Sequence, residues 1–179
     1  MHDAPAPPFS SNHRWWIYLL IAGLIGALDQ AVKYAVVATM PYRASYEITP
    51  FFNLVHVWNT GAAFSFLADA GGWQRYFFTV IGIAVSVALA WLLKRGVESR
   101  LETAAYTLIM GGAVGNIIDR LARGFVVDYL DFHWWGWHWP AFNVADICIT
   151  VGAVLMVAAT CFAAGGRNNA ATLPKVDRE

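Results

Sequence analysis

Two aspartates in the C-terminal half of the chain, Asp128 and Asp146, have side chains and surroundings suited to acid–base chemistry. Asp146 interrupts the apolar run 142–166, and Asp128 follows two valines. Two carboxylates in a low-dielectric site cannot both ionise cheaply, so they tend to share one proton. An aspartic protease uses such a pair, one carboxylate deprotonating water while the other polarises the scissile carbonyl. A proton- or ion-coupled transporter also places acids inside a helix bundle, so these two residues alone leave both chemistries open.

Other polar residues gather near the ends of the apolar segments. A charge at the centre of a bilayer costs at least ~2.5–3.5 kcal/mol, so such residues need a structural or functional reason. The set comprises Asp29, Lys33, Asn116, Asp119, Arg120 and Asn143. Their i, i+3 and i, i+4 spacings put neighbours on common helix faces. We expect either structural ion pairs, Asp29 with Lys33 and Asp119 with Arg120, or one polar pocket that includes the aspartate pair.

The composition indicates a membrane protein. Of the 179 residues, 58% are hydrophobic and 13% are charged, whereas soluble domains have about 45–50% and about 25%. A helix needs about 20 residues to cross the hydrocarbon region. We predict an all-α integral membrane fold in a single domain, 1–179, with transmembrane helices at about 15–38, 74–93, 102–120 and 142–165. Asp29 and Lys33 in the first helix argue against a cleaved signal peptide, whose apolar region is short and uncharged.

Lys and Arg near the helix ends predict the orientation. One side of a four-span arrangement carries Arg14, Lys94, Arg95, Arg100, Arg167, Lys175 and Arg178, and three of these fill a single short loop. Because basic residues in short loops stay on the cytoplasmic side, we expect both termini in the cytoplasm. The polar residues named above then lie near the opposite, periplasmic face.

The first outer segment, about 39–73, is the largest extramembrane part. Its stretch 51–58 is rich in Val, Phe and Trp, and the turn-like Asn59-Thr60-Gly61 follows. We predict a small β-sheet in this segment, lying on the membrane surface. The tryptophans of the second outer segment, 121–141, suit the headgroup layer. The tails, 1–12 and 167–179, have the composition of unstructured chain.

Several partner classes are not expected. The twelve basic and twelve acidic residues balance, so nothing indicates a nucleic-acid partner. His133 and His138 lack a third nearby ligand for a metal site, and no cofactor is expected. We expect a monomer, since one chain carries all the residues that the polar pocket needs.

Four sequence blocks, in order, resemble the bacterial lipoprotein signal peptidase family, also called signal peptidase II. They are Asp29-Gln30-Ala31-Val32-Lys33, Asn59-Thr60-Gly61-Ala62-Ala63-Phe64-Ser65, Gly115-Asn116-Ile117-Ile118-Asp119-Arg120 continuing to Val126-Val127-Asp128, and Phe142-Asn143-Val144-Ala145-Asp146. The resemblance covers residues 14 to 165, and four blocks in order are far more specific than any one of them.

The resemblance implies an inner-membrane aspartic endopeptidase that cleaves diacylglyceryl-modified prolipoproteins just before the lipidated cysteine. It implies catalysis by Asp128 and Asp146. It also assigns supporting or substrate-binding roles to Asp29, Lys33, Asn59, Gly61, Asn116, Asp119, Arg120 and Asn143. The partners would be the lipid-modified prolipoprotein and membrane lipid.

Three alternatives stay open in the sequence. Asp131 lies three residues after Asp128 and would face the same way in a helical turn. A small transporter or channel would use the acids as an ion relay, although they gather near one face and no inverted repeat is visible. A non-catalytic membrane scaffold would leave the gathered acids unexplained.

Overall fold

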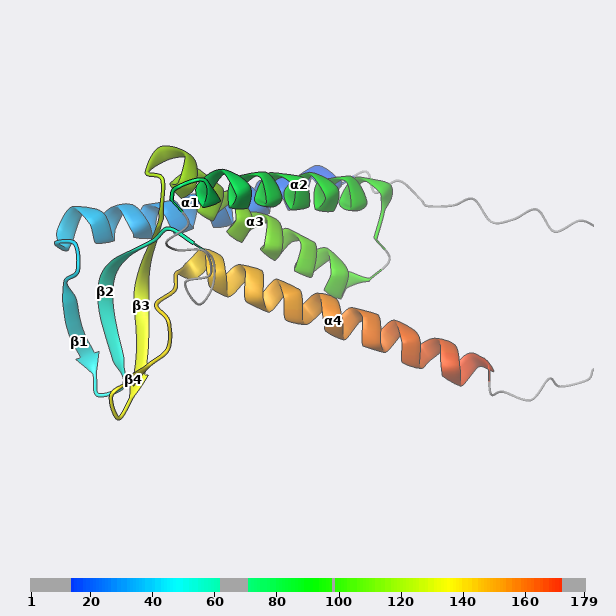
Figure 1. The fold of residues 1–179 in the computed structure, drawn as a ribbon. Coiled ribbons are helices and arrows are strands. Elements are labelled where there is room, and N and C mark those ends of the chain that lie inside the picture. The colour runs from blue at the N-terminus through cyan, green and yellow to red at the C-terminus, as the bar shows by residue number, and fades with distance from the viewer. Residues whose placement is uncertain (1–13, 62–70, 98, 172–179) are drawn as a thin grey trace, which may run out of the picture.

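Four long helices form the body of the protein. The computed structural model describes residues 14–61, 71–97 and 99–171. The helices are α1 (Trp15–Thr39), α2 (Gln74–Arg95), α3 (Arg100–Ala122) and α4 (Val144–Ala171). Each is long and apolar enough to cross a membrane. Together with the small sheet that joins them at one end (Figure 1), they confirm the predicted fold class.

The helix ends differ from the predicted ones by a few residues, mostly for local reasons. α3 begins at Arg100 because Ser99 caps it, the hydroxyl accepting from the backbone N–H of Glu102 at 3.4 Å. α4 begins two residues later than predicted and continues to Ala171, so part of the predicted C-terminal tail is helical. The predicted tail 1–12 and residues 172–179 lie outside the described residues.

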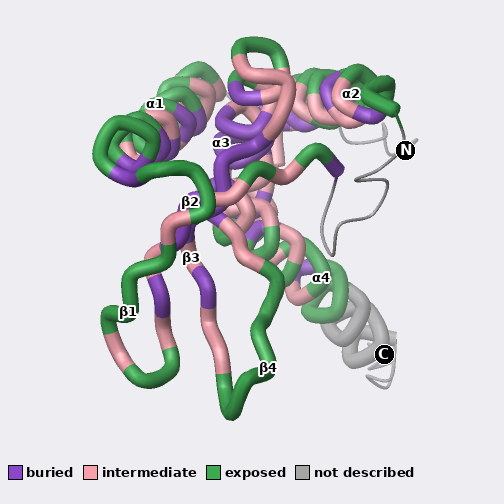
Figure 2. Tube along the Cα trace, turned by 60° about the vertical axis from the view of Figure 1, so that its left-hand side comes forward, coloured by how far each residue is buried: buried purple, intermediate pink, exposed green. Residues whose placement is uncertain are grey.

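α3 lies in the centre of the bundle and packs against each of the other three helices. Figure 2 shows it as the most continuously buried of them. Small residues allow the contacts: a Cβ on Gly111 would lie 2.7 Å from Ile25 of α1, and one on Gly112 would lie 2.3 Å from the Ala145 carbonyl oxygen of α4. Gly111 and Gly115 have the GxxxG spacing that allows close helix approach, and a Cβ on either would meet residues of α1.

A four-stranded antiparallel sheet lies at the end of the bundle where α1 ends and α4 begins (Figure 1). Its strands, in spatial order, are β1 (Ser45–Thr49), β2 (Phe52–Asn59), β3 (Val126–Trp134) and β4 (Trp137–His138). The sequence predicted strands only in the first outer segment. The second outer segment supplies the other two strands, because the apolar residues that begin β3 are buried between β2 and the helices.

The sheet packs against the end of α1. Val36 of α1 and Met40, which follows the helix, form a buried cluster with Val127 and Tyr129 of β3. His56 of β2 strengthens this junction, with its Nδ1 bonded to the Met40 carbonyl at 2.9 Å. The position of β3, which carries Asp128, is therefore set by the end of α1.

Candidate active site

Asp146 lies in the first turn of α4 and takes part in a capping box. The side chain of Asn143, just before the helix, accepts from the Asp146 backbone N–H at 2.9 Å. In return, the Asp146 carboxylate accepts from the Asn143 backbone N–H at 3.3 Å. This reciprocal pair fixes the start of the helix, where the helix dipole favours a negative charge. The sequence motif Asn-Val-Ala-Asp thus builds a rigid site for one carboxylate.

Asp128 lies on β3 and is 2% exposed. Its two carboxylate oxygens accept from different asparagines, Asn143 Nδ2 at 2.7 Å and Asn59 Nδ2 at 3.0 Å. Asn143 therefore bonds both Asp128 and Asp146 and holds the two carboxylates beside each other. Three segments far apart in the sequence meet at this point: the end of β2, the start of β3 and the start of α4.

The environment of Asp128 favours its protonated form. Burial, and then the negative charge of Asp146, raise the pKa of Asp128 from its ordinary 3.8 to about 7. The hydrogen bonds from Asn59 and Asn143 act in the opposite direction, because they favour the charged form. Below about pH 7 such a pair holds one proton, as acid–base chemistry on water requires.

Asn116 of α3 joins the aspartate pair to a buried lysine. Its Nδ2 donates to Asp146 Oδ1 at 2.8 Å, and its Oδ1 accepts from Lys33 Nζ at 2.9 Å. Because Lys33 occupies the amide oxygen, the amide nitrogen must face the carboxylate. The orientation of this asparagine is thereby fixed.

Lys33 is the centre of a fully buried ion network. Its ammonium lies 2.8 Å from Asp29 and 2.8 Å from Asp119, and all three side chains are inaccessible to solvent. The predicted Asp29–Lys33 pair is therefore confirmed. The predicted pairing of Asp119 with Arg120 is wrong: Asp119 pairs with Lys33 and Arg123 instead. Arg123 follows Asp119 by one helical turn, a spacing that the sequence would have revealed.

The two acids of this network brace the backbone next to the two candidate catalytic aspartates. Asp29 Oδ1 accepts from the backbone N–H of Ala145 at 3.0 Å, immediately before Asp146. Asp119 Oδ2 accepts from the backbone N–H of Val127 at 3.1 Å, immediately before Asp128. Lys33 thus connects the two backbone positions that set the geometry of the pair. No sequence spacing could have indicated these two contacts, which depend on the tertiary fold.

Arg120 faces the pair from α3. Its Nη2 donates to the Gly61 carbonyl at 2.9 Å, and its guanidinium lies 5.3 Å from the ring centre of Phe78. Asn59 closes the adjacent turn by accepting from the Gly61 N–H at 3.0 Å. Arg120 therefore holds the end of β2, including Asn59, against the bundle. The remaining residues of this sequence block, 62–65, lie outside the described residues.

Asp131 lies away from this site. Residues three apart on a strand point to opposite faces of the sheet, so Asp131 and Asp128 diverge. The Asp131 carboxylate instead accepts from Asn53 Nδ2 at 2.9 Å and lies 3.0 Å from His138 Nδ1. The helical turn that would have put both aspartates on one side is not formed, because this segment is β3.

A groove of about 830 Å³ opens beside the pair. Its polar end contains Asp128, Asp146, Asn116 and Arg120, and its walls come from α2, α3, α4 and the sheet. α2 and α4 each pack against α3, and both contribute residues to the groove wall. The groove therefore extends from the aspartates along the apolar surfaces of the helices.

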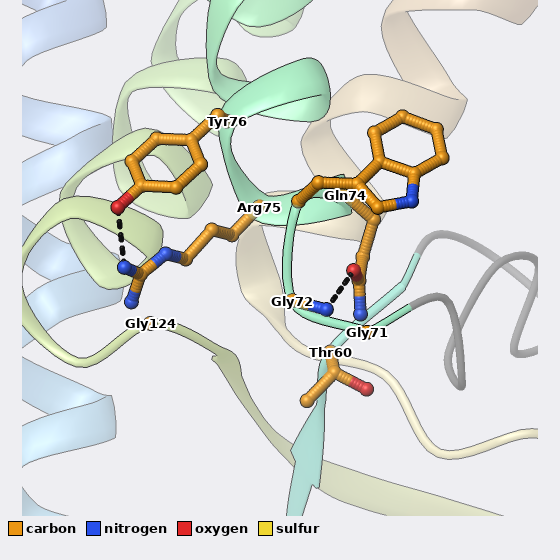
Figure 3. A pocket seen from close by; sticks show the side chains of 8 residues that line it. Thr60, Gly71, Gly72, Gln74, Arg75, Tyr76 and Gly124 are labelled. Carbon is orange, nitrogen blue, oxygen red and sulfur yellow. Dashed lines mark hydrogen bonds between the residues drawn. The ribbon is translucent and has the colours of Figure 1, made fainter.

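A smaller pocket of about 530 Å³ lies at the start of α2 (Figure 3). Thr60, Gly72, Gln74 and Arg75 are among its lining residues, with Gly72 N–H donating to Gln74 Oε1 at 2.7 Å. No carboxylate is found among the described residues that line it. Over the described ranges, no three His, Cys, Asp or Glu side chains are arranged to hold a metal ion.

Comparisons with known sequences all point to one protein family. Residues 21–162 match the family described as "Signal peptidase (SPase) II". The chain is 55% identical to the lipoprotein signal peptidase of Serratia marcescens over 154 residues, which is 85% of this chain and 89% of that protein. It is 57% identical to the lipoprotein signal peptidase of Cupriavidus necator, with 79% of this chain and 81% of that protein covered.

Two solved structures resemble the fold, both described as bacterial membrane enzymes. The first has a TM-score of 0.77 and 29% identity and covers 96% of this chain and 98% of that one. The second has a TM-score of 0.70 and 31% identity and covers 87% and 97%. The arrangement of helices and sheet is thus shared with membrane enzymes over nearly the whole chain.

Proposed function

Because the chain belongs to the signal peptidase II family, we propose that Asp128 and Asp146 are the catalytic pair of this membrane aspartic peptidase. The protein removes signal peptides from lipoproteins, as its relatives' names state. The observation that carries the catalytic assignment is the position of Asn143, which bonds both carboxylates at the polar end of the groove.

The pair activates water for attack on the scissile carbonyl. The ionised carboxylate takes a proton from the water while the protonated one donates a hydrogen bond to the carbonyl oxygen. The oxygen of water then bonds to the carbonyl carbon, and the carbonyl oxygen takes the proton. As the C–N bond breaks, the amine of the leaving cysteine residue takes the proton that came from water. As the C=O bond re-forms, a hydroxyl group of the tetrahedral intermediate passes its proton to the other carboxylate, which restores the singly protonated pair.

The surroundings of the pair support a division of roles. The raised pKa of Asp128 suits the residue that holds the proton. Asp146 lies at a helix N-terminus and accepts from Asn116 Nδ2 and the Asn143 N–H, contacts that favour a charged carboxylate. We therefore assign Asp128 as the proton donor to the carbonyl and Asp146 as the base.

The groove suits a peptide substrate that carries a lipid. Its apolar walls reach into the membrane-spanning part of the bundle, so acyl chains and an apolar signal peptide stay in an apolar environment. The last residues of β2, Val57 to Asn59, line the groove. We propose that their backbone groups bind the extended peptide, which needs such partners once it is dehydrated. We propose that the substrate is diacylglyceryl-modified and is cut just before the modified cysteine.

The location of the site follows from the helix orientation. With both termini in the cytoplasm of the bacterial inner membrane, the groove's polar end faces the periplasm. We further propose that one chain is sufficient, because every residue of the site comes from a single protomer.

The proposal is tested with purified protein and a diacylglyceryl-modified prolipoprotein in detergent. We expect cleavage of the bond before the modified cysteine, identified by mass spectrometry, and no cleavage by Asp128→Asn or Asp146→Asn. Each variant must still bind the uncleaved substrate, which shows that it is folded. Cleavage at normal rates by either variant would refute the assignment. A well-folded parent that cleaves no lipidated substrate would instead favour the transporter alternative.

A further inference from the structure

The groove contains a hydroxyl group one helical turn beyond Asp146. Thr150 follows Asp146 by four positions on α4, so the two side chains lie on the same face of the helix. Both line the groove, and Thr150 is exposed to it. Ile149 and Val151, which flank it on α4, also line the groove, as do the apolar Ile81 of α2 and Ile117 of α3. The Thr150 hydroxyl is thus a polar group in an apolar part of the groove.

This hydroxyl differs from every other helical threonine hydroxyl in the part of the chain that the structure describes. The other threonines, Thr39, Thr79, Thr103, Thr107 and Thr160, each donate to the carbonyl oxygen four residues earlier, at 2.7 to 3.0 Å. The Thr150 hydroxyl makes no hydrogen bond to any described residue. A hydroxyl without a partner in an apolar environment is costly, so a ligand that offers an acceptor there gains affinity.

The position of Thr150 matches one acceptor in the substrate. Four helical residues advance about 6 Å along α4, so the hydroxyl lies about that far from Asp146, deeper in the bundle. In a diacylglyceryl-modified cysteine, about eight bonds separate the scissile carbonyl carbon from an ester carbonyl, a reach of roughly 10 Å when extended. With the scissile carbonyl beside the aspartates, an ester carbonyl reaches Thr150.

We propose that Thr150 Oγ1 donates a hydrogen bond to an ester carbonyl of the substrate's diacylglyceryl group and is a specificity-determining residue. This inference rests on the proposed function. A signal peptide that is helical in the membrane satisfies its own carbonyls, whereas an ester carbonyl brings no donor with it. The ester is therefore the acceptor that benefits most from an unoccupied hydroxyl at this depth.

Two substitutions and two substrates test the contact. Thr150→Val keeps the shape of the side chain without the hydroxyl, and Thr150→Ser keeps the hydroxyl. The substrates are a prolipoprotein with the usual diacyl (ester) group and the same prolipoprotein with a dialkyl (ether) group, which lacks the carbonyls. On the ester substrate, we expect Thr150→Val to lower kcat/KM about fivefold, mainly by raising KM, and Thr150→Ser to stay close to the parent. On the ether substrate, Thr150→Val and the parent should be equal.

Thr160→Val is the matched control, because Thr160 lies on the same helix, is exposed and already bonds to the Met156 carbonyl. It should leave both substrates unaffected. An equal loss with Thr150→Val on the ester and ether substrates would overturn the inference and point to a contact with the peptide. No loss on either substrate would also overturn it. Failure of the parent to cleave both substrates would count against the proposed function instead.

Discussion

At the level of single residues, the proposed chemistry depends on a proton shared by Asp128 and Asp146. The pair needs one proton to function, and ionising Asp128 beside Asp146 removes it. Because burial and the charge of Asp146 raise the pKa of Asp128 to about 7, the working form predominates below that pH. The pH at which Asp128 loses this proton is the alkaline limit of activity. Above it, kcat/KM should fall about tenfold per pH unit.

Asn59→Ala tests the link between this pKa and the structure. Asn59 donates to Asp128 Oδ2 at 3.0 Å and so favours the charged carboxylate. Removing that donor raises the pKa of Asp128 further, which moves the alkaline limit of kcat/KM to higher pH even if the maximum rate falls. The measurement is the pH profile of cleavage for parent and variant. A limit that moves to lower pH, or does not move, would contradict this account.

Local spacing predicted some residue contacts and missed others. The Asp29–Lys33 pair follows from its i, i+4 spacing, and the structure contains it. Spacing could not place Asp128 and Asp131, because a helical turn brings them together and a strand separates them. It also gave Asp119 the wrong partner, since the buried ammonium that Asp119 contacts belongs to α1. Contacts between elements need the tertiary fold.

At the level of elements, the close packing of α3 against α4 fixes the position of Asp146. A Cβ on Gly112 would lie 2.3 Å from the Ala145 carbonyl oxygen, which belongs to the residue before Asp146. Gly112→Ala should therefore displace the start of α4, lowering the free energy of unfolding by about 1–3 kcal/mol and reducing kcat. Thermal unfolding in detergent and cleavage rates measure the two effects.

Gly23→Ala is the matched control for that substitution. Gly23 lies within α1, and a Cβ there meets no atom within 4 Å. Alanine is a better helix former than glycine, so this variant should be as stable as the parent or slightly more stable, with unchanged activity. If both glycine variants behave alike, close helix packing does not position the site.

Lys33 of α1 connects that helix to α3 and to the site through its buried ion pairs. Lys33→Met would leave the buried Asp29 and Asp119 without their common cation. Removing one partner of a buried ion pair costs about 3–5 kcal/mol, so the variant should unfold well below the parent's Tm. The control variant, Lys94→Met, removes an exposed lysine in the last turn of α2. It should change the free energy of unfolding little. Equal stability of Lys33→Met and parent would show that the network is not structural.

Composition and apolar runs were sufficient to predict the four helices, because the bilayer requires long apolar segments. The second half of the sheet was not predicted. The tryptophans of segment 121–141 indicated a membrane-surface loop, yet Val126–Trp134 forms β3 by pairing with β2 from the other outer segment. Such pairing joins residues far apart in sequence, and local patterns do not specify it.

At the level of the whole molecule, the distribution of basic residues predicts the orientation in the membrane. Trp137 lies on β4 in the sheet at one end of the bundle, and Arg95 ends α2 at the other end; both are exposed. In a Cys148→Ser, Cys161→Ser background, W137C should react with a membrane-impermeant maleimide in intact spheroplasts. R95C should react only after lysis. The reverse pattern would place the active site on the cytoplasmic side.

The most direct test of the account compares three aspartate variants in one cleavage assay. Asp128→Asn, Asp146→Asn and Asp131→Asn are purified, shown to bind a diacylglyceryl-modified prolipoprotein, and assayed for signal-peptide release. The first two variants should lose roughly 10⁴-fold or more in kcat. Asp131→Asn should stay within a few-fold of the parent, because that residue faces His138 and Asn53. An inactive Asp131→Asn beside an active Asp128→Asn would contradict the proposed pair.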